Sequence, residues 1–331
     1  MMVLAPSPRR ALAAALLALS AWAAQAQPAP TAPTASDCPP APPALTPERL
    51  QQEVRAARDR GLLWRVEKDG RRSWLYGTLH VARADWVVPG PTVLRALQGS
   101  DLLALELNPL DAESLRPLMA PADPAIAQRV LGLARRARLA TQAAALCLPL
   151  QALAHQRPVM QAVTLTVLAA RREALYAEFA VDAVLASTAQ AQRQPIVALE
   201  QASEQLALLA GRDDAEEGDL FDSALDELAS GEGAEQLRAL AQAWADGDLA
   251  MLERYPQWCH CLDTPVEREQ MKRLLDDRNA PMAGKIAALH EGGRRVFAAV
   301  GALHMIGPQG LPTLLRARGF SVTREPWPAA P

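Results

Sequence analysis

The sequence contains no long block of basic residues, and its 331 residues carry a formal net charge of −3. Proteins that hold nucleic acids need clustered lysine and arginine to neutralise phosphates. The charge balance therefore argues against a nucleic-acid partner. Half of the residues are hydrophobic, many of them alanine and leucine, so we expect most of the chain to be helical.

Long apolar runs are scarce as well, and the one that stands out lies near the start. Residues 11–24 are apolar but too few to span a bilayer as an ordinary helix. They follow a basic segment, residues 1–10, and precede the small-x-small sequence Ala24-Gln25-Ala26. These features predict a secretory signal peptide over residues 1–26. We expect an exported protein, periplasmic or secreted.

Cysteine is rare, and the first one, Cys38, is too far from the apolar run to carry a lipid anchor. We therefore expect no stable membrane anchor after signal cleavage. In an exported chain, four cysteines favour disulfides over free thiols. A direct bond between Cys259 and Cys261 would be strained by the single residue between them. We expect each of these two to pair with Cys38 or Cys147.

The segment Cys259-His260-Cys261 would also suit half of a zinc site. No second Cys/His cluster completes such a site. The sequence therefore favours the disulfides.

Proline, alanine and threonine dominate residues 27–47. Such a composition buries little surface, which predicts a disordered leader. Residues 48–331 suffice for one large domain or two small ones, and we expect a single domain. Strand patterns at both ends of this region enclose a helical insert of about residues 110–290. We predict an α/β fold (mixed α+β) with a central β-sheet and a large, predominantly helical middle region.

Two predicted strands end in the same Gly-x-x-His sequence. A hairpin over residues 62–76 leads into Gly77 and His80, and a late apolar strand leads into Gly301 and His304. Glycine lets the backbone leave a strand at dihedrals closed to other residues, or lets another group approach closely.

The carboxyl ends of strands in α/β sheets are where ligand sites gather. A single histidine at such a place is more often packed or solvated than a ligand. The repeated spacing of His80 and His304 nevertheless favours a metal site.

Two further predicted strands end in a glutamate. Residues 101–107 read as a strand buried on both faces apart from Glu106, and residues 195–200 end in Glu200. A buried carboxylate requires a cation, so Glu106 should face an arginine or a metal ion. The structural alternative for both glutamates is to cap a following helix or to pair with a surface arginine.

Seven short motifs, in this order, resemble the signature of the TraB/GumN family, which includes the Tiki-type metalloproteases. Each motif is weak alone, but seven in order over residues 62–324 are specific. The motifs are Leu75-Tyr76-Gly77-Thr78-Leu79-His80, Ala104-Leu105-Glu106-Leu107-Asn108, Ala180-Val181-Asp182, Leu199-Glu200 with Gln205, Trp244-x-x-Gly247-Asp248, Arg278-Asn279 and Val300-Gly301-Ala302-Leu303-His304-x-x-Gly307.

The resemblance implies a mixed α/β domain with a divalent-metal site held by His80, His304 and Glu106. Two positions depart from the family pattern: Ala180 stands where many relatives have glycine, and Asn108 where aspartate is common. The second departure weighs against a catalytic role for that position. Further family positions are matched by Asp182, Glu200, Arg278 and Asn279.

Metal chemistry then predicts a hydrolase. An ion held by the two histidines and Glu106 would keep an open position for water and lower the pKa of that water. Glu200 or Asp182 would serve as the base. Arg278 would stabilise the developing oxyanion, although an arginine there is equally consistent with pairing a carboxylate. With nitrogen and oxygen ligands, manganese, cobalt and zinc all suit the site.

We expect a peptide or protein substrate, as in the Tiki-type relatives. The alternative is a non-catalytic periplasmic module that binds or sequesters a peptide in the same crevice. A third possibility, a helical structural protein without a site, predicts that the two histidines lie far apart.

Overall fold

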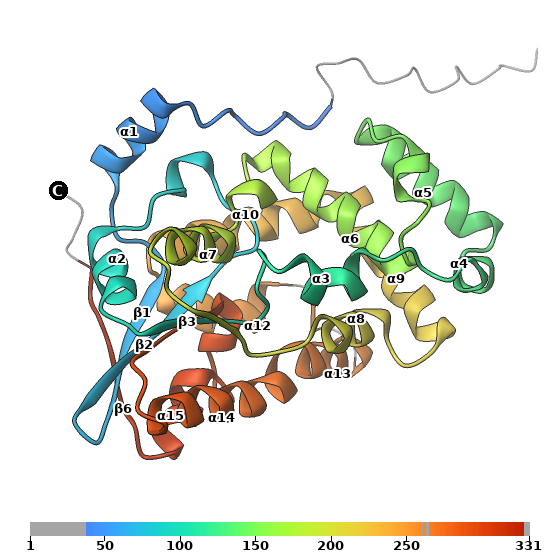
Figure 1. Cartoon of the computed structure of the whole chain (residues 1–331). Helices are drawn as coiled ribbons and strands as arrows, with labels where there is room; N and C mark the ends of the chain where they lie inside the picture. The colour runs from blue at the N-terminus through green and yellow to red at the C-terminus, as the bar shows by residue number, and fades with distance from the viewer. Residues whose placement is uncertain (1–37, 260, 263–264, 328–331) are drawn as a thin grey trace, which may run out of the picture. The chain divides into compact units, whose positions relative to one another are not determined.

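The computed structural model describes residues 38–259, 261–262 and 265–327 (Figure 1). The predicted signal peptide, residues 1–26, lies outside the described residues, as does the first part of the leader. The rest of the leader, residues 38–46, forms no helix or strand. Among the described residues, no helix combines the length and the apolar character needed to cross a membrane.

The described chain folds into a six-stranded sheet and many helices. The strands are β1 (Leu62–Lys68), β2 (Arg71–Thr78), β3 (Leu102–Leu105), β4 (Ile196–Ala198), β5 (Val296–Gly301) and β6 (Ser321–Arg324). The helices are α1 (Pro47–Ala56), α2 (Pro91–Gln98), α3 (Ala112–Met119), α4 (Pro124–Val130), α5 (Leu133–Ala145), α6 (Pro158–Ala169), α7 (Val181–Ala191), α8 (Ala202–Ala210), α9 (Asp214–Ser230), α10 (Glu232–Ala245), α11 (Leu249–Glu253), α12 (Tyr255–Trp258), α13 (Pro265–Met271), α14 (Asp277–Glu291) and α15 (Leu311–Ala317). Short helical turns are η1 (Ala84–Trp86), η2 (Leu150–Leu153), η3 (Ala170–Glu173), η4 (Ala177–Phe179), η5 (Lys272–Asp276) and η6 (Ala302–Met305).

The strands are arranged in the order β4-β3-β5-β2-β1-β6. β1 and β2 form the predicted antiparallel hairpin, which turns at Asp69 and Gly70, both with positive φ. β2, β5, β3 and β4 are mutually parallel. Because parallel strands end at the same edge of a sheet, the segments that follow these four strands meet at one edge.

Helices cover both faces of the sheet, which confirms the predicted α/β class. Side chains alternate along β5: Phe297 and Ala299 pack with the core toward α2, α7 and α10. Val296 and Ala298 pack with the core toward α14 and α15. Figure 1 shows α14 and α15 on one side of the sheet and α7 and α10 on the other. Full burial of a large apolar side chain such as Phe297 stabilises the fold by roughly 1.5–3 kcal/mol.

The helical middle region has a core of its own. Leu139 on α5, Leu165 on α6 and Phe221 on α9 lie in a cluster that makes no use of the sheet. Glu217 is fully buried beside it, where the Arg157 guanidinium donates to its carboxylate at 2.9 and 3.0 Å. The same carboxylate accepts from the Val159 amide, which ties α9 to the start of α6.

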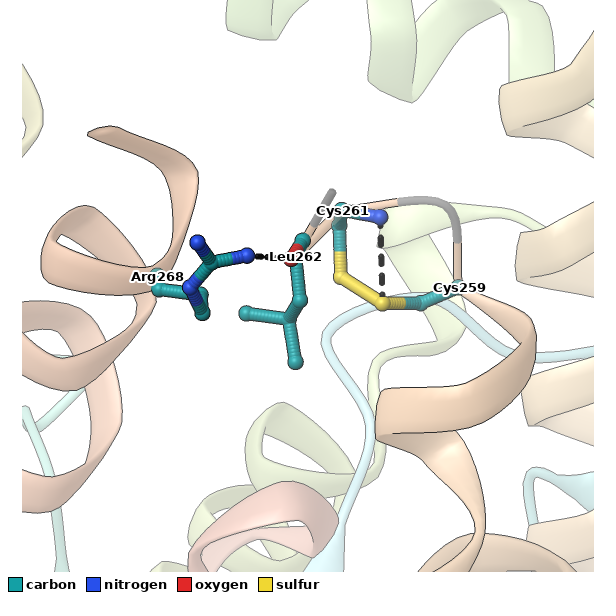
Figure 2. Close-up of a disulfide and its surroundings, with 4 residues drawn as sticks. All are labelled: Cys259, Cys261, Leu262 and Arg268. Atoms are coloured by element: carbon teal, nitrogen blue, oxygen red, sulfur yellow. Dashed lines mark hydrogen bonds between the residues drawn. A yellow bond between two sulfur atoms is a disulfide. The ribbon is translucent and has the colours of Figure 1, made fainter. Parts of the chain in front are cut away.

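The predicted cysteine pairing is wrong. Cys38 bonds Cys147, and Cys259 bonds Cys261 directly. The Cα atoms of Cys259 and Cys261 are 5.1 Å apart, within the normal range for a disulfide. The Cys261 amide also donates to Cys259 Sγ (Figure 2). One intervening residue is therefore enough. No cysteine within the described segments remains as a free thiol for a zinc site.

Candidate functional site

The ends of the four parallel strands bring the predicted site residues to one edge of the sheet. Glu106 follows β3 directly, and His80 and Glu200 each lie two residues beyond β2 and β4. His304 lies in η6, immediately after β5.

Three of these side chains surround Gly301. A Cβ atom at Gly301 would lie 3.2 Å from Oε1 of Glu106, 3.5 Å from Cδ2 of His304 and 3.9 Å from Nε2 of His80. The two histidines are therefore neighbours, contrary to the possibility of a protein without a site. The structure brings together the three residues that the sequence suggested as metal ligands.

Gly301 is required here for close approach rather than for an unusual dihedral. Its φ is −46°, which other residues can adopt, but its bare Cα lets Glu106 come near. The Gly301 amide donates to Glu106 Oε1 at 2.7 Å. Gly77, in the Gly-x-x-His sequence that ends in His80, also permits a close approach. A Cβ at Gly77 would lie 3.3 Å from the Cα of Ala302.

Arg278 joins the two strand-end glutamates. Its Nη2 atom lies 2.5 Å from Oε2 of Glu106 and 2.5 Å from Oε2 of Glu200. All three side chains are at most 14% exposed. Burial raises the pKa of Glu106, but its interactions with His304, which is protonated in the acid range where Glu106 titrates, and with His80 and Arg278 outweigh burial and lower that pKa to about 2. Arg278 is thus the cation that the sequence required for a buried Glu106.

Gln205, on α8, bridges the same two carboxylates. Its Nε2 atom donates to Oε2 of Glu200 at 2.9 Å and to Oε2 of Glu106 at 3.3 Å. The carboxylate pair is thus held by one guanidinium and one amide.

His304 is buried and held by Asn279, the residue that follows Arg278 on α14. The distance from His304 Nδ1 to Asn279 Oδ1 is 2.7 Å. An amide oxygen only accepts, so Nδ1 carries the proton and Nε2 keeps its lone pair. Burial lowers the pKa of His304 to about 4, despite the opposing charge of Glu106. His304 is therefore neutral at physiological pH.

His80 lies at the open side of the site, where its side chain is 66% exposed. Asp182, at the start of α7, places its Oδ2 atom 3.3 Å from His80 Nδ1. The segments are aligned by backbone bonds, since the Val181 amide donates to the Leu79 carbonyl at 2.8 Å. Desolvation lowers the pKa of His80. The hydrogen bond and the negative charge of Asp182, together with the charge of Glu106, outweigh desolvation and raise that pKa to about 9. The other oxygen of Asp182, Oδ1, is buried without a hydrogen-bond partner.

The donor chemistry of this site fits a divalent ion. Both imidazoles have Nδ1 engaged by a side-chain oxygen, which is the arrangement of metal-bound histidines. Nε2 of the neutral His304 is available to an ion, whereas His80, with its raised pKa, must first lose the proton on Nε2. Glu106 is instead engaged by Arg278 and the Gly301 amide. Within the described part of the chain, no group of three or more His, Cys, Asp or Glu side chains is arranged to hold a metal ion. Binding of one ion by Glu106 and both histidines therefore requires these side chains to shift.

The model of the TraB/PrgY/gumN family matches residues 62–324. The chain belongs to this family. The matched segment begins with β1 and ends with β6, so it contains the whole sheet and every strand end of the site. No curated protein and no solved structure matches the chain.

Three contacts of this site were not assigned roles from the sequence: the Gly301 amide, Asn279 and Gln205. Gln205 and Asn279 were visible only as members of family motifs. Gln205 lies five residues after Glu200, on α8, the helix that follows this strand end. Such a polar residue just beyond a strand-end acid is the signal that could have found it.

Proposed function

We propose that this family member is a divalent-metal-dependent hydrolase that acts on peptides. The observation that supports the proposal is the meeting of His80, His304 and Glu106 around Gly301, at the ends of three different strands. Two histidines with Nδ1 held, beside a carboxylate, form a donor set typical of catalytic metal sites once Nε2 of His80 has given up its proton.

In this proposal His80, His304 and Glu106 hold the ion, with manganese, cobalt and zinc as candidates. The ion would supply Lewis acidity and lower the pKa of a bound water. Asp182 and Asn279 orient the two imidazoles through their Nδ1 atoms. Asp182 is therefore better suited to positioning His80 than to acting as a base.

Glu200 is the remaining candidate base. Its carboxylate accepts from the Arg278 guanidinium, and a carboxylate can accept a proton from an attacking water. Arg278 also places a fixed positive charge at the site, where it can offset negative charge that develops on a substrate. Its contacts to two carboxylates support a structural function as well.

We further propose that the protein works outside the cytoplasm, in the periplasm or as a secreted protein. Two disulfides suit an oxidising compartment, in agreement with the predicted signal peptide. The expected partner is a peptide or protein substrate.

Elemental analysis of the purified mature chain, with and without chelator treatment, tests the proposal. We expect about one divalent ion per chain, and cleavage of members of a peptide library that the chelator abolishes. His80→Ala combined with His304→Ala should remove both the metal and the cleavage. His155→Ala is the matched control, since His155 is exposed and lies outside the site.

A chain that carries no stoichiometric metal, and whose double variant behaves as the wild type, would contradict the proposal. If no metal is found, the second candidate is a non-catalytic peptide-binding module. The ion pair between Glu106 and Arg278 favours it, because this pair gives Glu106 a partner other than a metal ion. Peptide binding that persists without metal and without cleavage would identify it.

A further inference from the structure

β4 is an edge strand that leads directly into the candidate site. It stands at one end of the sheet order, and β3 is its only neighbour among the described strands. Two residues after β4 comes Glu200, whose carboxylate belongs to the site. In Figure 1 the stretch of chain between α7 and α8, which contains β4, is drawn toward the viewer without a helix over it.

The hydrogen bonds to β3 show which backbone groups of β4 remain unused. The Leu103 amide donates to the Pro195 carbonyl at 2.9 Å, and the Leu199 amide donates to the Leu105 carbonyl at 2.7 Å. In a parallel ladder, alternate residues of a strand bond a given neighbour. Pro195, Val197 and Leu199 therefore face β3.

The amide and carbonyl groups of Ile196 and Ala198 point to the opposite side. Ile196 is half-buried and Ala198 is exposed. Neither side chain is charged or long enough to cover the edge. The outer side of β4 thus presents two donors and two acceptors, in the spacing of a strand, to the surroundings.

We propose that the outer edge of β4 binds an extended peptide as a seventh strand and directs it toward Glu200. Unpaired strand edges bind extended chains through main-chain hydrogen bonds, largely independently of peptide sequence. The inference rests on the proposed function only for the choice of a peptide as the ligand.

The direction of β4 leads a chain docked on its outer edge toward the site. Glu200 stays beside the end of β3, because its amide donates to the Glu106 carbonyl at 2.9 Å. The Leu199 and Glu200 amides thus both donate toward β3, and the alternation of β4 ends at Leu199. Two residues of extended chain span roughly 7 Å, and adjacent strands lie about 4.8 Å apart. A peptide paired with Ala198 therefore passes beside Glu200. The other edge strand, β6, is separated from β5 by β2 and β1 and leads to no residue of the site.

N-methyl scanning of a bound peptide tests this proposal. Fluorescein-labelled decapeptides from a positional library are first ranked by fluorescence anisotropy against the mature chain in the presence of Mn²⁺. Each amide of the strongest binder is then N-methylated in turn. We expect binding to weaken about fivefold or more at alternate amides, those that face β4, since each lost hydrogen bond contributes about 1 kcal/mol. The amides between them face away and are the matched controls.

Two measurements on the protein locate the edge. Peptide binding should slow amide hydrogen exchange at Ile196 and Ala198 and leave Val197, already bonded to β3, unchanged. Ala198→Pro removes one outward donor and should weaken binding about fivefold or more. The peptide scan requires no change in the protein, so it decides the question even if this variant does not fold.

These binding measurements are separate from cleavage. An alternating scan with protection at Ile196 and Ala198 supports the inference, even for a protein that cleaves nothing. A flat scan, exchange protection elsewhere, or no binding by any peptide overturns it. Measurements of metal content and of peptide cleavage test the proposed hydrolase function independently.

Discussion

Arg278 shows at the scale of a single residue how the site is held together. Two glutamates from different strands share one guanidinium, and all three side chains are largely removed from water. Burial opposes each of these charges, and only the pairing compensates for the lost hydration. The same contacts raise the pKa of Arg278, through hydrogen bonds and charge interactions with Glu200 and Glu106 that outweigh its burial. Loss of the guanidinium leaves two like charges facing each other.

Arg278→Ala should therefore destabilise the protein by about 3–5 kcal/mol, the usual cost of removing one partner of a buried ion pair. The midpoint of urea unfolding at neutral pH measures the loss. Arg116→Ala is a matched control, because the Arg116 side chain is 72% exposed in a surface pair with Glu113. Exposed pairs contribute about 0–1 kcal/mol, so the control should remain close to the wild type.

Glu106→Gln and Glu200→Gln, added to Arg278→Ala, should recover part of the lost stability because neutral amides do not repel each other. A loss below about 1 kcal/mol for Arg278→Ala, with no recovery in the combined variant, would show that the guanidinium does not stabilise the carboxylate pair.

At the scale of elements, Glu216 links the first turn of α9 to η5. Its carboxylate accepts from the Arg273 guanidinium, and from the Arg212 amide and Nε at 2.7 and 2.9 Å. Burial raises the pKa of Glu216, but Arg273 and Arg212 outweigh it and lower that pKa to about 2. η5 leads directly into α14, which carries Arg278 and Asn279. This contact thus supports the helix that supplies two residues of the site.

Glu216 should make stability depend on pH in the acid range. Its pKa in the folded state is below the ordinary value of 4.5, so its contribution is fully present above about pH 4.5. The contribution is lost progressively as the pH falls toward 2 and the carboxylate takes up a proton. Urea unfolding of the wild type and Glu216→Gln from pH 7 to pH 2.5 measures it.

The variant should be less stable at pH 7, and the difference between the two proteins should narrow below pH 4.5. Glu113→Gln is the control, since the Glu113 side chain is 78% exposed and should give parallel curves. A gap between wild type and Glu216→Gln that stays constant down to pH 2.5 would contradict the assignment.

For the whole molecule, the two disulfides close loops of very different size. Cys38 and Cys147 are 109 residues apart, whereas Cys259 and Cys261 are two apart. A disulfide stabilises mainly by restricting the unfolded chain, and the effect grows with the closed loop. The long loop contains the hairpin, β3 and α3 to α5. The first bond should therefore contribute most of the disulfide stabilisation.

Replacing Cys38 and Cys147 by serine should lower the free energy of unfolding by about 4–5 kcal/mol, on the loop-entropy estimate. Replacing Cys259 and Cys261 by serine should cost under about 2 kcal/mol on the same estimate. Thermal and urea unfolding of the two double variants measure the difference. An equal or reversed order would mean that local contacts at Cys259 and Cys261, rather than loop length, determine their contribution.

The alternation of apolar residues and the glycines at strand ends determined much of the fold. The hairpin over β1 and β2 follows from its alternating pattern, and the strands that lead to Glu106, Glu200 and His304 follow from short continuous apolar runs, since both patterns are visible in the sequence. The observed strands β3 and β4 are shorter than the apolar runs that predicted them. Strand ends depend on where a neighbour stops pairing, which local pattern does not encode.

The sequence by itself determined the residue types of the site and their places at strand ends, since these depend on short-range periodicity and on glycine. Only the tertiary structure decided which of these side chains contact each other. In the folded protein Glu106 pairs with Arg278. Asp182 contacts His80, and Asn279 contacts His304. Cys259 is bonded to Cys261. Such partners are chosen by the order of parallel strands and the packing of helices across long separations, and no local rule of sequence fixes those distances.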